Sequence, residues 1–197
     1  MTAIFRSASA DDARFTDFSN QFLMAMPGMV NDELAGTVIY ICEHTPRGAL
    51  GLVLNRPTDL TLASLFERVD LTVAMGPTAD EKVFFGGPVQ TDRGFVLHAP
   101  AGDYSSSIRL GDLALTTSRD VLQAVAEGQG PARLFVTLGY AGWGAGQLES
   151  EMSQNAWLSV AADPVIIFDV PAEERYPAAM RLLGIDPLML AGEAGHA

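Results

Sequence analysis

Short runs of hydrophobic residues, each closed by a proline, a glycine or a polar cluster, recur along the chain. Runs of this length that are rich in β-branched and aromatic residues are typical of buried β-strands. The pattern predicts strands at residues 22–26, 37–42, 49–54, 83–85, 95–98, 132–138 and 165–168. Thr45-Pro46-Arg47-Gly48 separates the second and third of these and has the composition of a hairpin turn.

Three other segments repeat their hydrophobic residues at three- and four-residue spacing, which indicates amphipathic helices. The predicted helices cover residues 61–69, 119–127 and 171–184. Ser118 is a suitable N-cap for the second helix and Gly128 ends it, while Pro171 opens the third. Because strands and helices are mixed without a strict βαβ alternation, the predicted fold class is α+β.

The segment from Leu138 to Glu149, here called the glycine-rich segment, follows a predicted strand and precedes a predicted helix. A strand, a glycine-rich turn and a helix can converge backbone N–H groups on a ligand. The spacing matches neither a P-loop nor a dinucleotide fingerprint, and Glu149 and Glu151 would repel a phosphate from the helix start. We interpret the glycines as allowing close backbone packing beside Tyr140 and Trp143. The alternative that a neutral or cationic ligand stacks on the Trp143 ring is left open.

The glycine-rich segment and several other blocks, taken in order, resemble the YqgE/AlgH family of bacterial proteins, whose biochemical role is not established. The other blocks are residues 22–29, 38–44, 48–57, 86–89, 93–98, 116–122, 155–158 and 195–197. The resemblance runs from about Phe15 to the C-terminus, and the chain departs from the family pattern at Gly36 and Tyr104. It implies a mixed sheet, strongly curled into a partial barrel, with several short helices packed around it.

The composition fits one globular domain in the cytoplasm. The chain has 197 residues, of which 48% are hydrophobic and 18% charged, and it has a single cysteine. Residues 1–16 are polar and read as a loosely held arm, which leaves residues 17–197 as a single domain. The first fifteen residues do not read as a secretory signal, and no run is long enough to span a membrane.

The charge balance argues against direct binding to nucleic acid. Twelve basic and twenty-four acidic residues give a net charge of −12. Binding to DNA phosphates needs clustered lysine and arginine, whereas the arginines here are scattered singly along the chain. Family naming has at times implied a transcriptional regulator, but these residues do not support direct contact with DNA.

No complete catalytic or metal-binding set is visible in the sequence. Cys42 ends an apolar run, so we expect a buried structural thiol, although His44 shares its strand face. Ser118, His98 and Asp120 could be drawn as a triad, yet the N-cap position already explains the serine. The three histidines are isolated and form no ligand pair. We therefore assign no catalytic residues, no metal and no cofactor.

The candidate ligand- or partner-binding residues are polar and aromatic groups together with two glycines of the glycine-rich segment. They are Asn55, Arg56, Thr117, Tyr140, Gly142, Trp143, Gly144 and Gln147. Asn55 and Arg56 could recognise a carboxylate or a backbone carbonyl. Equally, they could bond their own turn and a local acid such as Glu43 or Asp59.

Two hypotheses of different classes follow. The first is a non-enzymatic protein that binds a small ligand or a protein partner, in a regulatory role. The second is an enzyme of unrecognised mechanism with a pocket near a glycine-rich turn at Tyr140–Glu149, in which Glu43, His44 or Glu149 acts as acid or base. A shifted pKa inside a concave pocket would separate the two hypotheses. The sequence does not reveal the ligand, the partner or the oligomeric state.

Overall fold

The described residues, 15–25, 33–74 and 76–186 of a computed structural model, form a mixed sheet of ten strands. Eight strands follow one path in the order β10-β1-β2-β3-β9-β6-β8-β7, and every pair along it is antiparallel. The strands are β1 (Gln21–Ala25), β2 (Val38–Thr45), β3 (Gly48–Val53), β4 (Pro57–Thr61), β5 (Lys82–Phe85), β6 (Val89–Ala99), β7 (Ser107–Leu110), β8 (Leu113–Thr116), β9 (Arg133–Gly144) and β10 (Trp157–Ala161). Off the path, β4 pairs with β5, and β5 runs parallel to β9.

Six short helices accompany the sheet in this described part of the chain. They are α1 (Leu62–Arg68), α2 (Pro77–Asp80), α3 (Arg119–Ala126), α4 (Gln147–Ser153), α5 (Pro164–Phe168) and α6 (Ala172–Leu182). Side-chain capping hydrogen bonds define where some of these helices begin. Thr61 accepts a hydrogen bond from the Ser64 N–H at α1, and Asp163 accepts one from the Val165 N–H at α5. None of these helices is long and apolar enough to cross a bilayer.

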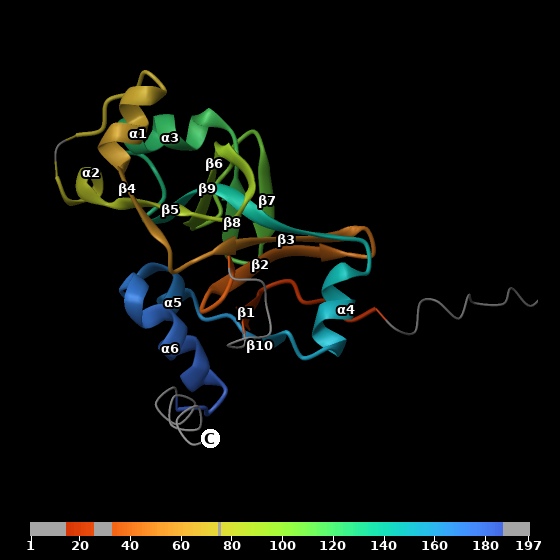
Figure 1. The fold of residues 1–197 in the computed structure, drawn as a ribbon. Coiled ribbons are helices and arrows are strands. Elements are labelled where there is room, and N and C mark those ends of the chain that lie inside the picture. Colours follow the sequence, from red (N-terminus) through yellow and green to blue (C-terminus); the bar gives the residue numbers. More distant parts are fainter. Residues whose placement is uncertain (1–14, 26–32, 75, 187–197) are drawn as a thin grey trace, which may run out of the picture.

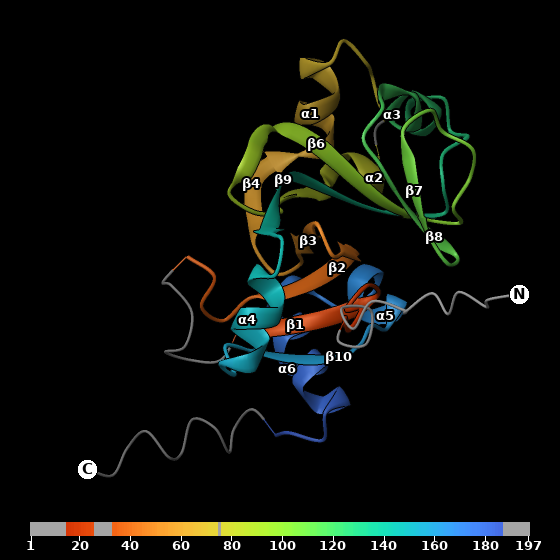
Figure 2. The same cartoon turned by 90° about the vertical axis from the view of Figure 1, so that its right-hand side faces the viewer.

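The sheet curls strongly into an open half-barrel, which confirms the α+β class and the curled sheet that the family resemblance implied (Figure 1). In both views β4–β8 and α1–α3 gather in one half, while β1–β3, β10 and α4–α6 gather in the other (Figures 1 and 2). The long strand β9 belongs to both halves, because its first residues pair with β6 and its last residues pair with β3.

Buried side chains form three groups, and the sheet separates two of them. Alternate residues of β1 point to opposite faces, so Phe22 and Met24 join a group under α5 and α6 while Leu23 joins a group under α4. The third group lies under α1 and α3 and includes Phe66 and Val121. Burial on both faces explains why β1 reads as a continuous hydrophobic run instead of an alternating one.

Most predicted elements are confirmed, with shifted ends. Strands appear at each predicted range but one, and the hairpin turn pairs Thr45 with Gly48. The predicted helices correspond to α1, α3 and α6, and α4 is the helix predicted after the glycine-rich segment. The last residue of the first predicted strand, Met26, lies outside the described residues. The pattern missed β4, β7, β8, β10 and α2, all of which have five residues or fewer.

The strand predicted at residues 165–168 is wrong, because these residues form α5. Pro164 occupies a first-turn position, which suits its fixed φ, and the Asp163 carboxylate accepts from the Val165 N–H at 2.9 Å. A four-residue apolar run does not by itself distinguish a strand from a buried helical turn. The cap and the proline decide in favour of the helix.

The glycine-rich segment is mostly strand, so the predicted turn at Tyr140–Glu149 is wrong in its placement. Strand β9 continues to Gly144, and only two residues separate it from α4, with Gly146 as N-cap at φ 72°. Gly139 has φ 74°, and a Cβ there would lie 2.4 Å from the carbonyl oxygen of Gly87. At this crossing the structure confirms that glycine permits a close backbone approach.

Candidate functional site

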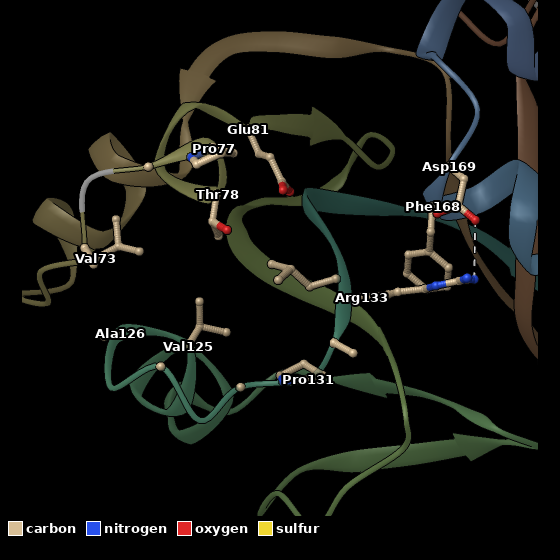
Figure 3. A pocket seen from close by; sticks show the side chains of 16 residues that line it. Val73, Pro77, Thr78, Glu81, Val125, Ala126, Pro131, Arg133, Phe168 and Asp169 are labelled. Atoms are coloured by element: carbon tan, nitrogen blue, oxygen red, sulfur yellow. Dashed lines mark ion pairs between the residues drawn. The ribbon is translucent and has the colours of Figure 1, made fainter.

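A cleft of about 580 Å³ lies between α2, the loop that follows α3, the start of β9 and the end of α5 (Figure 3). The wall is mixed, with apolar side chains such as Val73, Val125 and Phe168 beside a larger share of polar surface. Thr78 and Glu81 point into it from the side of α2. Concave sites with apolar walls and a few convergent polar groups are typical of small-molecule binding.

Glu81 is the polar group of this cleft whose ionisation the environment alters. It follows α2 directly, and its backbone is held at both ends: its N–H donates to the Thr78 carbonyl and its own carbonyl accepts from the Leu62 N–H. Glu81 as a residue is exposed, but partial desolvation inside the cleft raises the pKa of its carboxyl group. Within the described residues no basic side chain lies at ion-pair distance from it. Glu81 is therefore placed to accept a hydrogen bond or a positive charge from a ligand.

Arg133 and Asp169 close one rim of the cleft by an ion pair between the start of β9 and the end of α5. The guanidinium Nη1 lies 3.5 Å from the carboxylate Oδ2, and each side chain is 46% exposed (Figure 3). Exposed pairs of this kind add at most about 1 kcal/mol to stability. The pair can therefore open towards a ligand at little energetic cost.

A second cavity of about 410 Å³ adjoins the cleft and shares four lining residues with it. The shared residues are Glu81, Leu134, Phe168 and Asp169. The second cavity extends to Lys82 on β5 and to Arg175 on α6. The two cavities thus place a partly desolvated carboxylate and a buried guanidinium along neighbouring walls.

Asn55 and Arg56, two of the residues singled out in the sequence, bind the backbone of the segment that leads into β2. Asn55 Oδ1 accepts from the Val38 N–H at 3.1 Å, and its Nδ2 donates to the Gly36 carbonyl at 2.9 Å. Arg56 Nη2 donates to the Ala35 carbonyl at 3.2 Å. These bonds do not follow the prediction that Asn55 bonds its own turn and Arg56 a local acid, because both side chains bind backbone groups of residues 35–38.

Trp143 and Gln147 meet at the carboxylate of Glu151. Trp143 Nε1 and Trp157 Nε1 both donate to Glu151 Oε2, at 2.9 and 2.8 Å, and Gln147 Nε2 donates to Oε1 at 2.9 Å. Gln147 Oε1 also accepts from the Gly144 N–H. Trp143 is only 7% exposed, so its ring is largely taken up by packing.

The remaining predicted residues are divided between two shallow hollows. Tyr140 and Trp143 line one of about 260 Å³ together with Arg47, and Gly142 is exposed beside Tyr140. Thr117 lines another, of about 340 Å³, and its hydroxyl accepts from Arg93. The structure therefore does not assemble the eight predicted residues into one pocket. A ligand at the Tyr140 hollow stays a prediction.

Comparison with known proteins bears on the chain as a whole. A family model described as AlgH-like (DUF179) matches residues 22–188. The chain belongs to this family. UPF0301 proteins of Bordetella petrii and Ralstonia nicotianae are 79% and 62% identical to it, over 95% and 92% of this chain and 94% and 96% of theirs.

The fold of the AlgH-like chain also matches solved structures. The solution structure of the AlgH protein from Pseudomonas aeruginosa superposes with a TM-score of 0.77 at 46% identity, covering 98% of this chain and all of that one. A crystal structure from Corynebacterium diphtheriae, at 22% identity, shares the fold with a TM-score of 0.67. The family resemblance read from the sequence blocks is thereby confirmed.

Of the residues considered for acid–base catalysis in this AlgH-like chain, His44 and Glu149 come together. His44 is 4% exposed, and its Nε2 lies 3.3 Å from Glu149 Oε1, at ion-pair distance but outside hydrogen-bond geometry. Its Nδ1 accepts from the Phe18 N–H, and the rings of Phe15 and Phe18 lie against it. In the described residues the imidazole is enclosed by Phe15, Phe18 and Glu149, and the enzyme hypothesis stays untested.

The triad drawn from Ser118, His98 and Asp120 does not form. His98 instead lies within hydrogen-bond distance of the Pro100 carbonyl and of the Thr116 hydroxyl, and burial lowers its pKa. The Ser118 hydroxyl donates to Asp120 and, although Ser118 is the N-cap residue, makes no capping bond to α3. Cys42 is buried as expected, and burial raises the pKa of its thiol.

The residues of the cleft and the second cavity carried no signal in the sequence. Arg133 and Asp169 are single charges beside hydrophobic residues, and Glu81 and Arg175 belong to the short charged runs 80–82 and 173–175, which is also how surface charges appear. Only the meeting of β5, β9, α5 and α6 brings them near one another. The described residues contain no group of three or more potential metal ligands.

Proposed function

We propose that this AlgH-like protein binds a small polar molecule in the cleft between α2, α3 and β9. The observation that carries the proposal is Glu81, a carboxylate with a raised pKa that points into a cleft of about 580 Å³ without a basic partner in the described residues. Titratable groups perturbed by burial inside a concave site are frequent at functional sites.

The lining defines the kind of molecule. Val73, Val125 and Phe168 offer apolar contact, and Thr78 and Glu81 offer a hydroxyl and a carboxylate. A ligand with an amine or another hydrogen-bond donor would bind the partly desolvated carboxylate of Glu81. The ligand therefore combines a small apolar body with a donor group, and no reaction is required of the site.

The test is a thermal-shift screen against amines, amino acids, nucleosides and sugars. A ligand present at a hundred times its Kd stabilises the folded state by about 2.7 kcal/mol. We expect at least one class of amine-bearing compound to stabilise the wild-type protein, and Glu81→Gln to abolish the effect. Glu67→Gln, which changes an exposed carboxylate on α1, is the matched control and keeps it.

Two results would overturn the proposal. One is a panel without any stabilising compound. The other is a hit that survives Glu81→Gln but is lost in Arg47→Ala, because Arg47 lines the hollow beside Tyr140 and Trp143. That outcome would locate the ligand at the glycine-rich segment.

A further inference from the structure

Arg175 is a cation placed inside the fold. It belongs to the first turns of α6, is 6% exposed, and its guanidinium lies 4.9 Å from the ring centroid of Phe84 and 5.0 Å from that of Phe135. Burial lowers its pKa to about 10, against an opposing effect of the nearby Glu173. At neutral pH the side chain is therefore still positively charged.

Its protein partners are neutral. Nε donates to the Val170 carbonyl at 2.9 Å and Nη1 donates to the Leu54 carbonyl at 2.5 Å. In the described part of the chain no carboxylate lies within ion-pair distance of the guanidinium. Carbonyl bonds and ring contacts hold the group in position, but they do not supply the negative charge that normally accompanies a buried cation.

The unused donors of Arg175 coincide with a cavity. An arginine side chain has five N–H donors, and the two carbonyl bonds use two of them. Arg175 lines the cavity of about 410 Å³ that adjoins the cleft, together with Lys82 and the apolar Phe84 and Ile167. A purely structural role explains the two carbonyl bonds, but it does not explain a second cation on the same cavity.

We propose that this cavity is an anion site, in which Arg175 binds the carboxylate or phosphate group of a small molecule and Lys82 assists from the rim. The planar guanidinium matches the oxygens of either group in a bidentate arrangement. Glu81 and Asp169 on the shared wall repel a second negative charge. The molecule therefore carries one anionic group, and a donor group at its other end fits the cleft. The anion site itself is independent of the proposed function. Only the expectation of a donor group at the other end of the molecule rests on it.

The probe is inorganic phosphate, and acetate in a second arm, added to the full-length protein and followed by NMR of the arginine Nε–H and backbone amide signals. We expect saturable shifts at Arg175 and at the amides of Lys82 and Phe84, beyond those produced by sodium chloride at equal ionic strength. The stronger of the two arms identifies the group that the site prefers. Arg175→Lys should weaken binding about tenfold or more, because it removes the bidentate donor. Arg181→Lys, exposed on the same helix, is the matched control and should leave binding unchanged.

If Arg175→Lys does not fold, Lys82→Ala serves as the second variant. Lys82 is exposed on β5, so its substitution should leave folding intact. It should weaken phosphate binding by about threefold, the size of a partly screened charge contact. The inference is overturned if the shifts match those of chloride, fail to saturate, or centre on exposed arginines. Glu81→Gln separates the two proposals, because it should strengthen anion binding while it abolishes binding of the amine in the cleft.

Discussion

Glu151 joins the two tryptophans of the chain through one carboxylate oxygen. Trp143 comes from β9 and Trp157 from β10, so the contact ties two strands to α4. In Glu151→Gln the amide offers one acceptor and adds a donor that faces other donors. We expect the free energy of unfolding to fall by about 1–3 kcal/mol, the cost of leaving buried donors without a partner.

The measurement is urea unfolding followed by tryptophan fluorescence, which reports on this contact because the chain has two tryptophans. Glu127→Gln, on the exposed end of α3, is the matched control and should change stability by less than about 0.5 kcal/mol. Equal stability of Glu151→Gln and wild type would show that the carboxylate does not hold the two indoles.

The hydrogen-bonded carboxylate of Asp120 should make the stability of the fold depend on pH in the acidic range. Desolvation raises the pKa of this carboxyl group, but hydrogen bonds from Ser118, Ser105 and the Val121 N–H outweigh that effect and hold the pKa at about 2. A folded-state pKa below the unfolded value of 3.8 stabilises the fold above pH 3.8. That stability is lost as the pH falls through the range from about 4 to 2.

The corresponding variant is Asp120→Asn, compared with Asp112→Asn in the exposed turn between β7 and β8. We expect Asp120→Asn to lose about 1 kcal/mol at pH 7, because it weakens charged hydrogen bonds at a half-exposed site. The difference from wild type should shrink between pH 4 and pH 2 in chemical unfolding curves. A difference that is constant over this range would mean that the charge of Asp120 does not contribute.

The sequence could indicate Trp143 and Gln147 as important but could not show what they contact. An indole and an amide among glycines suggest a ligand, whereas the acceptor is Glu151, a residue on the following helix that reads in sequence as an ordinary surface acid. The reverse holds for Glu81, whose role depends on a cleft assembled from distant segments. Patterns report which side chains are buried, and they do not report which polar groups share a cavity.

At the level of elements, length decides what the pattern can predict. Long strands such as β2 and β9 and periodic helices such as α3 are visible because many residues agree. Segments of four or five residues are not, and Val165–Phe168 was wrongly predicted as a strand because its cap lies outside the apolar run. The pattern does not predict the continuation of β9 through three glycines, because glycine normally weakens a strand.

Strand β9 passes close to the backbone at Gly86-Gly87, so adding one methyl group at Gly139 should strongly lower stability. In Gly139→Ala the new Cβ meets the Gly87 carbonyl at 2.4 Å, and the backbone has φ 74°. We expect a loss of about 3 kcal/mol or more, because an unfavourable backbone conformation adds to a steric clash. In Gly94→Ala on β6 nothing lies within 4 Å of the new Cβ, and stability should stay within about 1 kcal/mol of wild type.

Thermal unfolding of both alanine variants by circular dichroism gives the comparison. A Gly139→Ala protein as stable as Gly94→Ala would mean that the two backbones separate easily at this point. Loss of stability in Gly94→Ala alone would contradict the assignment of the close approach to Gly139.

For the whole molecule, the two halves of the sheet are joined by β9 (Figure 2). The proposed site is lined by the first residues of β9, Arg133 and Leu134. Arg133 at the start of β9 pairs with Asp169 at the end of α5, and Arg175 of α6 reaches Leu54 just after β3. The cleft and the second cavity therefore lie where elements of both halves meet. A ligand there contacts both halves and should stabilise the fold as one unit.

The net charge of −12 predicts that salt raises the thermal stability of the protein. A chain with twice as many acidic as basic residues repels itself in the folded state, and screening relieves that repulsion. Sodium chloride between 20 mM and 500 mM should therefore raise the midpoint of thermal unfolding at pH 7.5, and the rise should be smaller at pH 5.5, nearer the pI of about 4.5. Screening does not distinguish anions, whereas the Arg175 cavity does. At equal low ionic strength, millimolar phosphate or acetate should add stability beyond chloride in the wild type and not in Arg175→Lys, and equal midpoints in all salts would leave screening as the whole effect.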